Sequence, residues 1–155
     1  MSSRTVYFIP NQRGAAAVEF AMVTILFFSL LFGVMEMGRM LFYWNTATEA
    51  TRMGARIAVV CDADEETGTY IRTRMNSLLP VLSPEKVEIL YRPEGCSGGG
   101  IKCTGVTVRV LPISVSTMIP FIPVTFNMPS FATTLPGESM ESMSNEGDLN
   151  PVCSA

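Results

Sequence analysis

Glu19 is the only ionisable residue between Ala15 and Met35, a mostly apolar stretch. As a helix, this stretch is long enough to cross a hydrocarbon core of roughly 30 Å. A carboxylate in such a segment costs on the order of 3 kcal/mol, so it indicates a functional role. A cut between Gly14 and Ala15 would leave Glu19 one helical turn from the new terminal ammonium. The residue types therefore predict an ion pair, within one chain or between packed neighbours, that offsets the burial of both charges.

A short polar leader precedes the apolar stretch, and its small residues lie before the apolar run. A secretory signal has the opposite order, with small residues at a cleavage site after the apolar region. We therefore expect a type III, or prepilin-type, signal in which residues 1–14 form a cleaved leader and Gly14 and Ala15 flank the cut. The alternative is an uncleaved signal anchor in which Glu19 lies near the lipid headgroups.

The residues that flank the apolar stretch indicate its orientation. Arg4, Arg13 and the initiating amine precede it, whereas Tyr43 and Trp44 follow it as candidate interfacial aromatics. The positive-inside rule then places the amino terminus in the cytoplasm. We expect a transmembrane helix at residues 15–43 that continues outside the membrane over residues 44–60, since no proline interrupts it.

The composition excludes several classes of protein. A length of 155 residues with 48% hydrophobic content allows one membrane-spanning element and one small domain. Histidine, the commonest general base and transition-metal ligand, is absent from the sequence, and no nucleophile motif is present. We therefore expect a protein that is not an enzyme and has no metal site or cofactor. A net charge of −3 disfavours nucleic acid as a partner.

All four cysteines, Cys61, Cys96, Cys103 and Cys153, follow the apolar stretch, which suggests disulfides in an oxidising compartment. Cys96 and Cys103 flank a glycine-rich loop whose ends a disulfide could join, and this bond would leave Cys61 with Cys153. Four cysteines allow three pairings, so the connectivity stays open. The spacing does not suit a four-cysteine zinc site.

The remainder of the chain predicts a small α+β domain at residues 61–136. Acidic residues after Cys61 favour the start of a second helix that ends near Leu79. Apolar residues then alternate with others at 87–91 and again at 106–110, which predicts an antiparallel hairpin.

Four prolines interrupt the apolar stretch at 119–135, where we expect only a short edge strand at 124–127. Residues 137–155 are polar and acidic and are expected to form a flexible tail. The predicted fold class is therefore α+β, with a long amino-terminal transmembrane helix that continues outside the membrane and then a small antiparallel β-sheet domain.

Two further motifs follow the glycine-ended leader and the glutamate-bearing helix. They are Glu36-Met37-Gly38-Arg39 and Ala50-Thr51-Arg52-Met53-Gly54-Ala55-Arg56. Together these features resemble the amino-terminal signature of TadE-like pseudopilins of the tight-adherence (Flp-type) type IV pilus system. The resemblance covers about Arg13 to Val59, and Thr51 stands where many relatives have alanine.

The resemblance implies a pilin-like fold and a minor pilin or pseudopilin, processed by prepilin peptidase, that primes or caps a Flp/Tad-type pilus for surface adherence. Its implied partners are the prepilin peptidase, other pilins or pseudopilins, the pilus assembly platform and the inner membrane. Its implied location is the bacterial inner membrane, in a single pass, with a cytoplasmic amino terminus and a periplasmic or extracellular carboxyl-terminal domain. Whether the chain enters the filament stays open.

The residues expected in helix packing and assembly are Glu19, Glu36, Gly38, Arg39, Arg52, Gly54 and Arg56. Glu36 and Arg39 share a helical face, so an interfacial salt bridge and a contact with another pilin are both open for them. The alternative function, from another class, is an uncleaved bitopic inner-membrane scaffold or receptor of a secretion apparatus.

Overall fold

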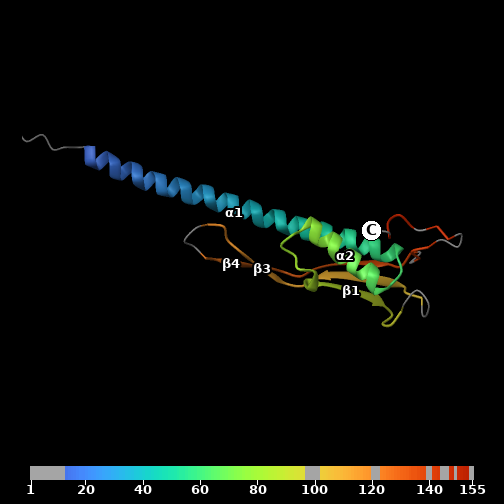
Figure 1. The fold of residues 1–155 in the computed structure, drawn as a ribbon. Coiled ribbons are helices and arrows are strands. Elements are labelled where there is room, and N and C mark those ends of the chain that lie inside the picture. The colour runs from blue at the N-terminus through green and yellow to red at the C-terminus, as the bar shows by residue number, and fades with distance from the viewer. Residues whose placement is uncertain are drawn as a thin grey trace, which may run out of the picture. The chain divides into compact units, whose positions relative to one another are not determined.

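The computed structural model describes residues 13–96, 102–119, 123–138, 141–143, 147–148 and 150–153, so residues 1–12 of the expected leader lie outside the described part. The elements in chain order are α1 (Arg13–Val60), α2 (Glu65–Leu78), the 3-10 turn η1 (Pro84–Lys86), β1 (Val87–Arg92), β2 (Gly105–Val110), β3 (Ile113–Ser116), β4 (Thr125–Met128) and β5 (Phe131–Pro136) (Figure 1). The chain forms two compact units, Met1–Gly38 and Arg39–Ala155. The boundary between them falls within α1.

The single helix α1 is 48 residues long and confirms the long amino-terminal helix expected from the sequence. It is continuous because the nearest prolines are Pro10 and Pro80. α2 begins after Asp64, whose carboxylate accepts a hydrogen bond of 2.7 Å from the backbone N–H of Thr67. This N-cap satisfies one of the free N–H groups at the start of the helix and confirms that the acidic stretch opens a second helix.

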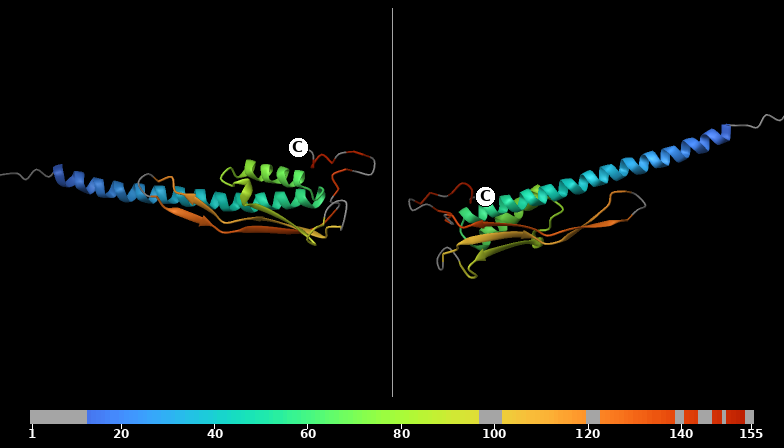
Figure 2. Two further views of the ribbon diagram at one scale, coloured as in Figure 1. Left: turned by 60° about the horizontal axis from the view of Figure 1, so that its bottom comes forward. Right: turned by 180° about the vertical axis from the view of Figure 1, so that it is seen from behind.

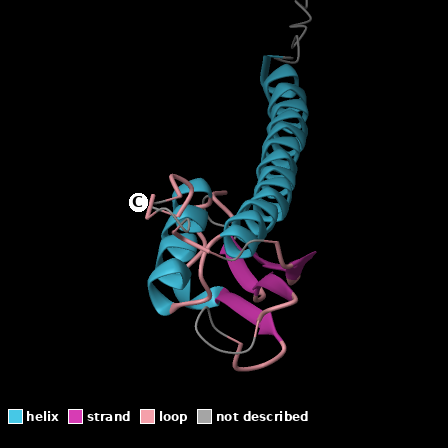
Figure 3. Ribbon diagram, turned by 90° about the vertical axis from the view of Figure 1, so that its right-hand side faces the viewer, coloured by secondary structure: helices cyan, strands magenta, loops and turns pink. Residues whose placement is uncertain are grey.

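The second unit has two layers, with α2 and the carboxyl-terminal half of α1 on one face of the sheet (Figure 2, Figure 3). Apolar side chains from all three components fill the space between the layers. Those with no exposed surface include Ala47, Ala50, Ala55, Ala58, Ile71, Met75, Leu79, Leu82, Val106, Val108 and Val110. The α1 contribution is mostly alanine, which lets the helix lie close to its neighbours.

The main sheet is antiparallel, with strand order β1-β2-β5. In the β1–β2 pair, Val87 lies opposite Val110 and Arg92 opposite Gly105, which confirms the predicted hairpin. Along β2 the side chains alternate between buried and half-buried, as expected for a strand with one face on the core.

The sequence prediction of a single short edge strand at 119–135 was wrong, because β3, β4 and β5 form the rest of a long hairpin. Val110 of β2 lies opposite Phe131 of β5, and Ile113 of β3 lies opposite Met128 of β4. Both ladders therefore share one register, which places Pro112 opposite Pro129. Proline has no N–H to donate, so the facing prolines interrupt hydrogen bonding without ending the hairpin.

Gly54 lies where α1 approaches both α2 and β2. A Cβ atom added there would lie 2.9 Å from Met75 Sδ, 3.2 Å from Ile71 Cγ2 and 3.3 Å from Val108 Cγ1. These separations are shorter than an ordinary contact of about 3.5–4.0 Å between carbon atoms. Glycine is therefore the residue that allows three elements to meet at this point.

We predict that Gly54→Ala destabilises the second unit. Overpacking costs about 1–3 kcal/mol, whereas alanine gains only about 1 kcal/mol over glycine in a helix interior. The free energy of unfolding of the full-length protein in detergent, followed by circular dichroism, measures the difference.

Gly68→Ala in α2 is the matched control for this substitution. The nearest atom to its added Cβ is Nη1 of the flexible Arg72 side chain, at 3.4 Å. The control should therefore gain about 1 kcal/mol from helix propensity alone. If Gly54→Ala were as stable as Gly68→Ala, the close approach at Gly54 would not limit packing.

Candidate functional site

The first unit presents an apolar helix whose large hydrophobic side chains are mostly exposed in the described chain. The helix Gly14–Val60 is long and apolar enough, by length and composition, to cross a membrane, and none of its most apolar window is buried. Phe20 is 73% exposed and Leu30 is 71% exposed. A helix that is apolar on all sides is stable in lipid or inside a protein assembly, but not in water.

The predicted processing residues lie in the first turns of this helix. Gly14, Ala15 and Glu19 are all exposed. A Cβ added at Gly14 would meet no atom within 4 Å. The described packing of this chain therefore does not require a glycine at position 14.

The Glu36-x-Gly38-Arg39 motif crosses the boundary between the two units. Glu36 is only 8% exposed, and a Cβ added at Gly38 would meet no atom within 4 Å. Arg39 is bound within the second unit, where its Nη2 donates to the carbonyl of Ser116 at 2.6 Å. Its guanidinium also lies over the ring of Tyr43, 5.3 Å from the centroid. Arg39 thus joins the helix to the end of β3.

The second motif divides between two faces of α1. Gly54 is buried in the core described above, whereas Arg52 and Arg56 are exposed. Arg52 forms an ion pair of 2.9 Å with Glu49. The two arginines lie one helical turn apart, so they share a surface that a partner can reach. Of these three predicted assembly residues, only the arginines lie on that surface.

Thr51, the departure from the family pattern, has a specific partner in this chain. Its side chain is 1% exposed, and its hydroxyl lies 3.0 Å from the hydroxyl of Thr133 on β5. The same hydroxyl donates to the carbonyl of Thr48 at 2.8 Å. The threonine therefore links α1 to the edge strand, whereas alanine offers no such bond.

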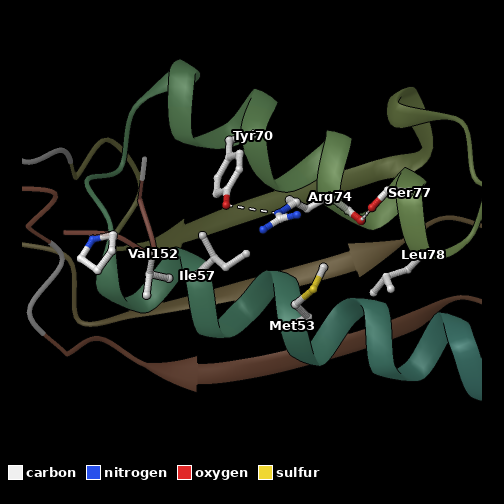
Figure 4. A pocket seen from close by; sticks show the side chains of 8 residues that line it. Met53, Ile57, Tyr70, Arg74, Ser77, Leu78 and Val152 are labelled. Atoms are coloured by element: carbon white, nitrogen blue, oxygen red, sulfur yellow. Dashed lines mark hydrogen bonds between the residues drawn. The ribbon is translucent and has the colours of Figure 1, made fainter. Parts of the chain in front are cut away.

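A groove of about 450 Å³ lies between α1 and α2, and sequence reasoning missed it. Its lining residues are Met53, Ile57, Tyr70, Arg74, Ser77, Leu78, Pro151 and Val152 (Figure 4). Arg74 Nε donates to the hydroxyl of Tyr70 at 3.2 Å, and the guanidinium lies 5.6 Å from the centre of that ring. The groove therefore offers an apolar surface beside one cation, which suits an apolar side chain next to a carboxylate.

Tyr91 on β1 is the group whose titration the fold shifts most clearly. Burial, and to a smaller extent the nearby Asp64 carboxylate, raises the pKa of Tyr91 to about 12 against the lowering effect of Arg72. Within the described residues its hydroxyl has no hydrogen-bond partner. The phenol therefore stays protonated at neutral pH. No group of three or more metal-ligating side chains occurs in the described part of the chain.

Two disulfides connect the four cysteines, Cys61 with Cys153 and Cys96 with Cys103. The first holds the carboxyl-terminal segment at the end of α1. Near it, the backbone N–H of Glu141 donates to the carbonyl of Val60 at 3.0 Å. This bond satisfies one of the carbonyls that a helix end leaves free.

A family model of TadE-like proteins matches residues 14–56. The match begins at the last residue of the expected leader and ends at Arg56, so it includes Glu19 and both motifs. It confirms the resemblance seen in the sequence. No curated protein and no solved structure matches the chain.

We predict that the two disulfides differ in their contribution to stability. Cys61 and Cys153 are separated by 92 positions, and Cys96 and Cys103 by 7. By the dependence of loop entropy on length, the first bond contributes about 4–5 kcal/mol and the second about 2–3 kcal/mol. The double variant Cys61→Ser/Cys153→Ser should therefore unfold at lower temperature than Cys96→Ser/Cys103→Ser.

Peptide mapping of the unreduced protein by mass spectrometry checks the pairing itself before the variants are compared. Equal losses of stability in the two double variants would contradict the predicted order.

Proposed function

We propose that this protein, which is TadE-like over residues 14–56, is a pseudopilin or minor pilin that helps to prime or cap a Flp/Tad-type pilus for surface adherence. TadE-like membership indicates a role in the Tad pilus system. One observation carries the proposal of a pseudopilin or minor pilin. The apolar helix of the first unit is exposed, and it begins with an exposed Gly14 and an exposed Glu19. Such a helix needs lipid or other apolar helices around it.

In this proposal the chain is made with its leader in the cytoplasm and held in the bacterial inner membrane by residues 15–43. Prepilin peptidase removes residues 1–14. The second unit then lies in the periplasm or outside the cell. The protein acts by assembly with other pilins and the assembly platform, and no catalytic turnover is needed.

Glu19 has a defined role in such an assembly. Its carboxylate is separated from the amine of Ala15 by one helical turn, on its own chain or on a packed neighbour. Opposite charges attract strongly in a medium of low dielectric constant, and the pairing offsets the cost of burying them. A pair between neighbouring helices would also fix their axial register.

A second candidate function is an uncleaved bitopic scaffold or receptor of a secretion apparatus. The groove between α1 and α2 favours it, because a receptor needs a surface of this kind in its exterior domain. The state of the amino terminus separates the two candidates, since the scaffold keeps residues 1–14.

We predict that the mature protein begins at Ala15 in cells with prepilin peptidase and at Met1 in cells without it. Gly14→Leu should block the cut, because the peptidase must approach the backbone closely at this position. Intact mass and amino-terminal sequencing of the membrane-extracted protein measure both effects. Gly33→Leu is the matched control, since a Cβ added at Gly33 also meets no atom within 4 Å. A peptidase-independent Met1 terminus in the unaltered protein would favour the scaffold.

We predict that Glu19→Ala leaves membrane insertion and cleavage unchanged but lowers the amount of co-purified pilins at least about tenfold. The physical reason is that loss of one partner of a buried ion pair costs about 3–5 kcal/mol. Glu94→Ala, which removes an exposed acid of the second unit, is the control and should co-purify normally. Normal yield of partners with Glu19→Ala would show that the carboxylate does not support assembly.

A further inference from the structure

We propose that the tip of the long hairpin rests in the lipid headgroup region of the membrane, on the side where the second unit lies. The hairpin tip is defined here as the described residues 117–119 and 123–126, at the ends of β3 and β4. The inference rests on the proposed function in one respect, namely that the first unit spans a membrane. It adds a second contact between this chain and lipid.

Charge distribution along the hairpin is the first argument. The sequence contains no ionisable residue from Val110 to Gly137, whereas the preceding part from Glu85 to Arg109 is rich in both acids and bases. The charges therefore gather on β1 and its connection to β2, and the long hairpin itself carries only Arg109, on β2 beside β1, and none toward its tip. Charged side chains are costly inside a bilayer, so this contrast suits a hairpin with one end in water and one end at a membrane.

Exposure of apolar side chains at the hairpin tip is the second argument. Met118 is 78% exposed, Phe126 is 45% exposed and Val124 is 42% exposed. Single exposed apolar residues are common on soluble proteins. The register places Val124 and Phe126 on one face of the tip and Met118 on the other, so both faces of this uncharged tip present apolar side chains that lipid solvates better than water.

The position of Arg39 sets the level of the tip relative to the membrane. Arg39 directly follows Gly38, the last residue of the unit that contains the apolar span. A guanidinium in the hydrocarbon core costs about 3 kcal/mol, and arginine beside tyrosine is typical of the interface. Arg39, near the outer end of the proposed span at residues 15–43, is therefore expected in the headgroup region together with Tyr43.

The hairpin is bound to Arg39 just before its tip begins. The guanidinium donates to the carbonyl of Ser116 at 2.6 Å, and the next residue is Thr117. Ser116 is thus held at the level of Arg39. Because Met118 lies only two residues beyond it, the tip cannot be far from the headgroups.

The described backbone of the tip is suited to a medium with little water. β3 and β4 pair over their whole length, from Ile113 opposite Met128 to Ser116 opposite Thr125. Beyond them, the N–H of Thr117 donates to the carbonyl of Val124 at 2.9 Å. Paired backbone groups lower the cost of entering the interface, where apolar faces reach about 5–10 Å deep.

Quenching of tryptophan fluorescence by brominated lipids tests this placement in the full-length protein. Trp44 is the only tryptophan, so Trp44→Phe provides a background for single-tryptophan variants. Met118→Trp reports on the tip, Leu90→Trp on β1, the charged strand beside the hairpin, and Phe28→Trp on the span. Leu90 is 45% exposed and Phe28 is 46% exposed, so both sites accept the larger ring.

The variants are reconstituted in phosphatidylethanolamine and phosphatidylglycerol vesicles with and without bromine on the acyl chains. We expect Phe28→Trp and Met118→Trp to lose about half of their fluorescence or more in brominated vesicles, and Leu90→Trp to lose almost none. Val124→Trp, on the opposite strand of the tip, should behave like Met118→Trp and repeats the test if that variant folds poorly.

The remaining outcomes separate the inference from the proposed function. Quenching at Phe28→Trp with none at Met118→Trp and Val124→Trp would overturn the inference, and the tip would then belong to a protein partner or to solvent. Absence of quenching at Phe28→Trp would overturn the span itself and the inference with it.

Discussion

The structure depends on one constraint, that a single helix has to be stable in two surroundings without a break. In the first unit α1 carries apolar side chains on all sides and satisfies its backbone groups within the helix, as lipid requires. In the second unit the same helix presents small buried residues, among them Ala47, Ala50 and Ala58, to the sheet and α2. The change occurs without a proline or a turn, so only the side chains distinguish the two halves.

The sequence predicted the elements whose periodicity is local. α1, α2 and the β1–β2 hairpin follow from helical or alternating patterns and from the acidic start of α2. The pairing of β3 with β4 and of β2 with β5 does not follow from such local patterns, because Pro112 and Pro129, each taken alone, are typical of a strand end. Only the pairing partner shows that they lie opposite each other and share one interruption. A non-local register is not visible in a single strand's sequence.

The candidate site was predictable where it is a linear motif and not where it is a surface. Gly14 and Glu19 stand out because their types are unusual next to an apolar run. Arg52 and Gly54 were grouped because they are neighbours in the sequence, but successive helical positions turn by about 100° and place them on different faces. The groove between α1 and α2 includes Met53, Tyr70 and Val152, and no local pattern connects those three segments.

The sheet and the carboxyl-terminal segment are bonded to the part of α1 after Gly38 at its start, its middle and its end. Arg39 binds Ser116 at the start, Thr51 binds Thr133 in the middle, and Cys61 is linked to Cys153 at the end. Three separate contacts therefore hold the domain to α1 along its length. The same bonds place the hairpin and the carboxyl-terminal segment relative to α1, so the surfaces available to partners follow from how this helix is held.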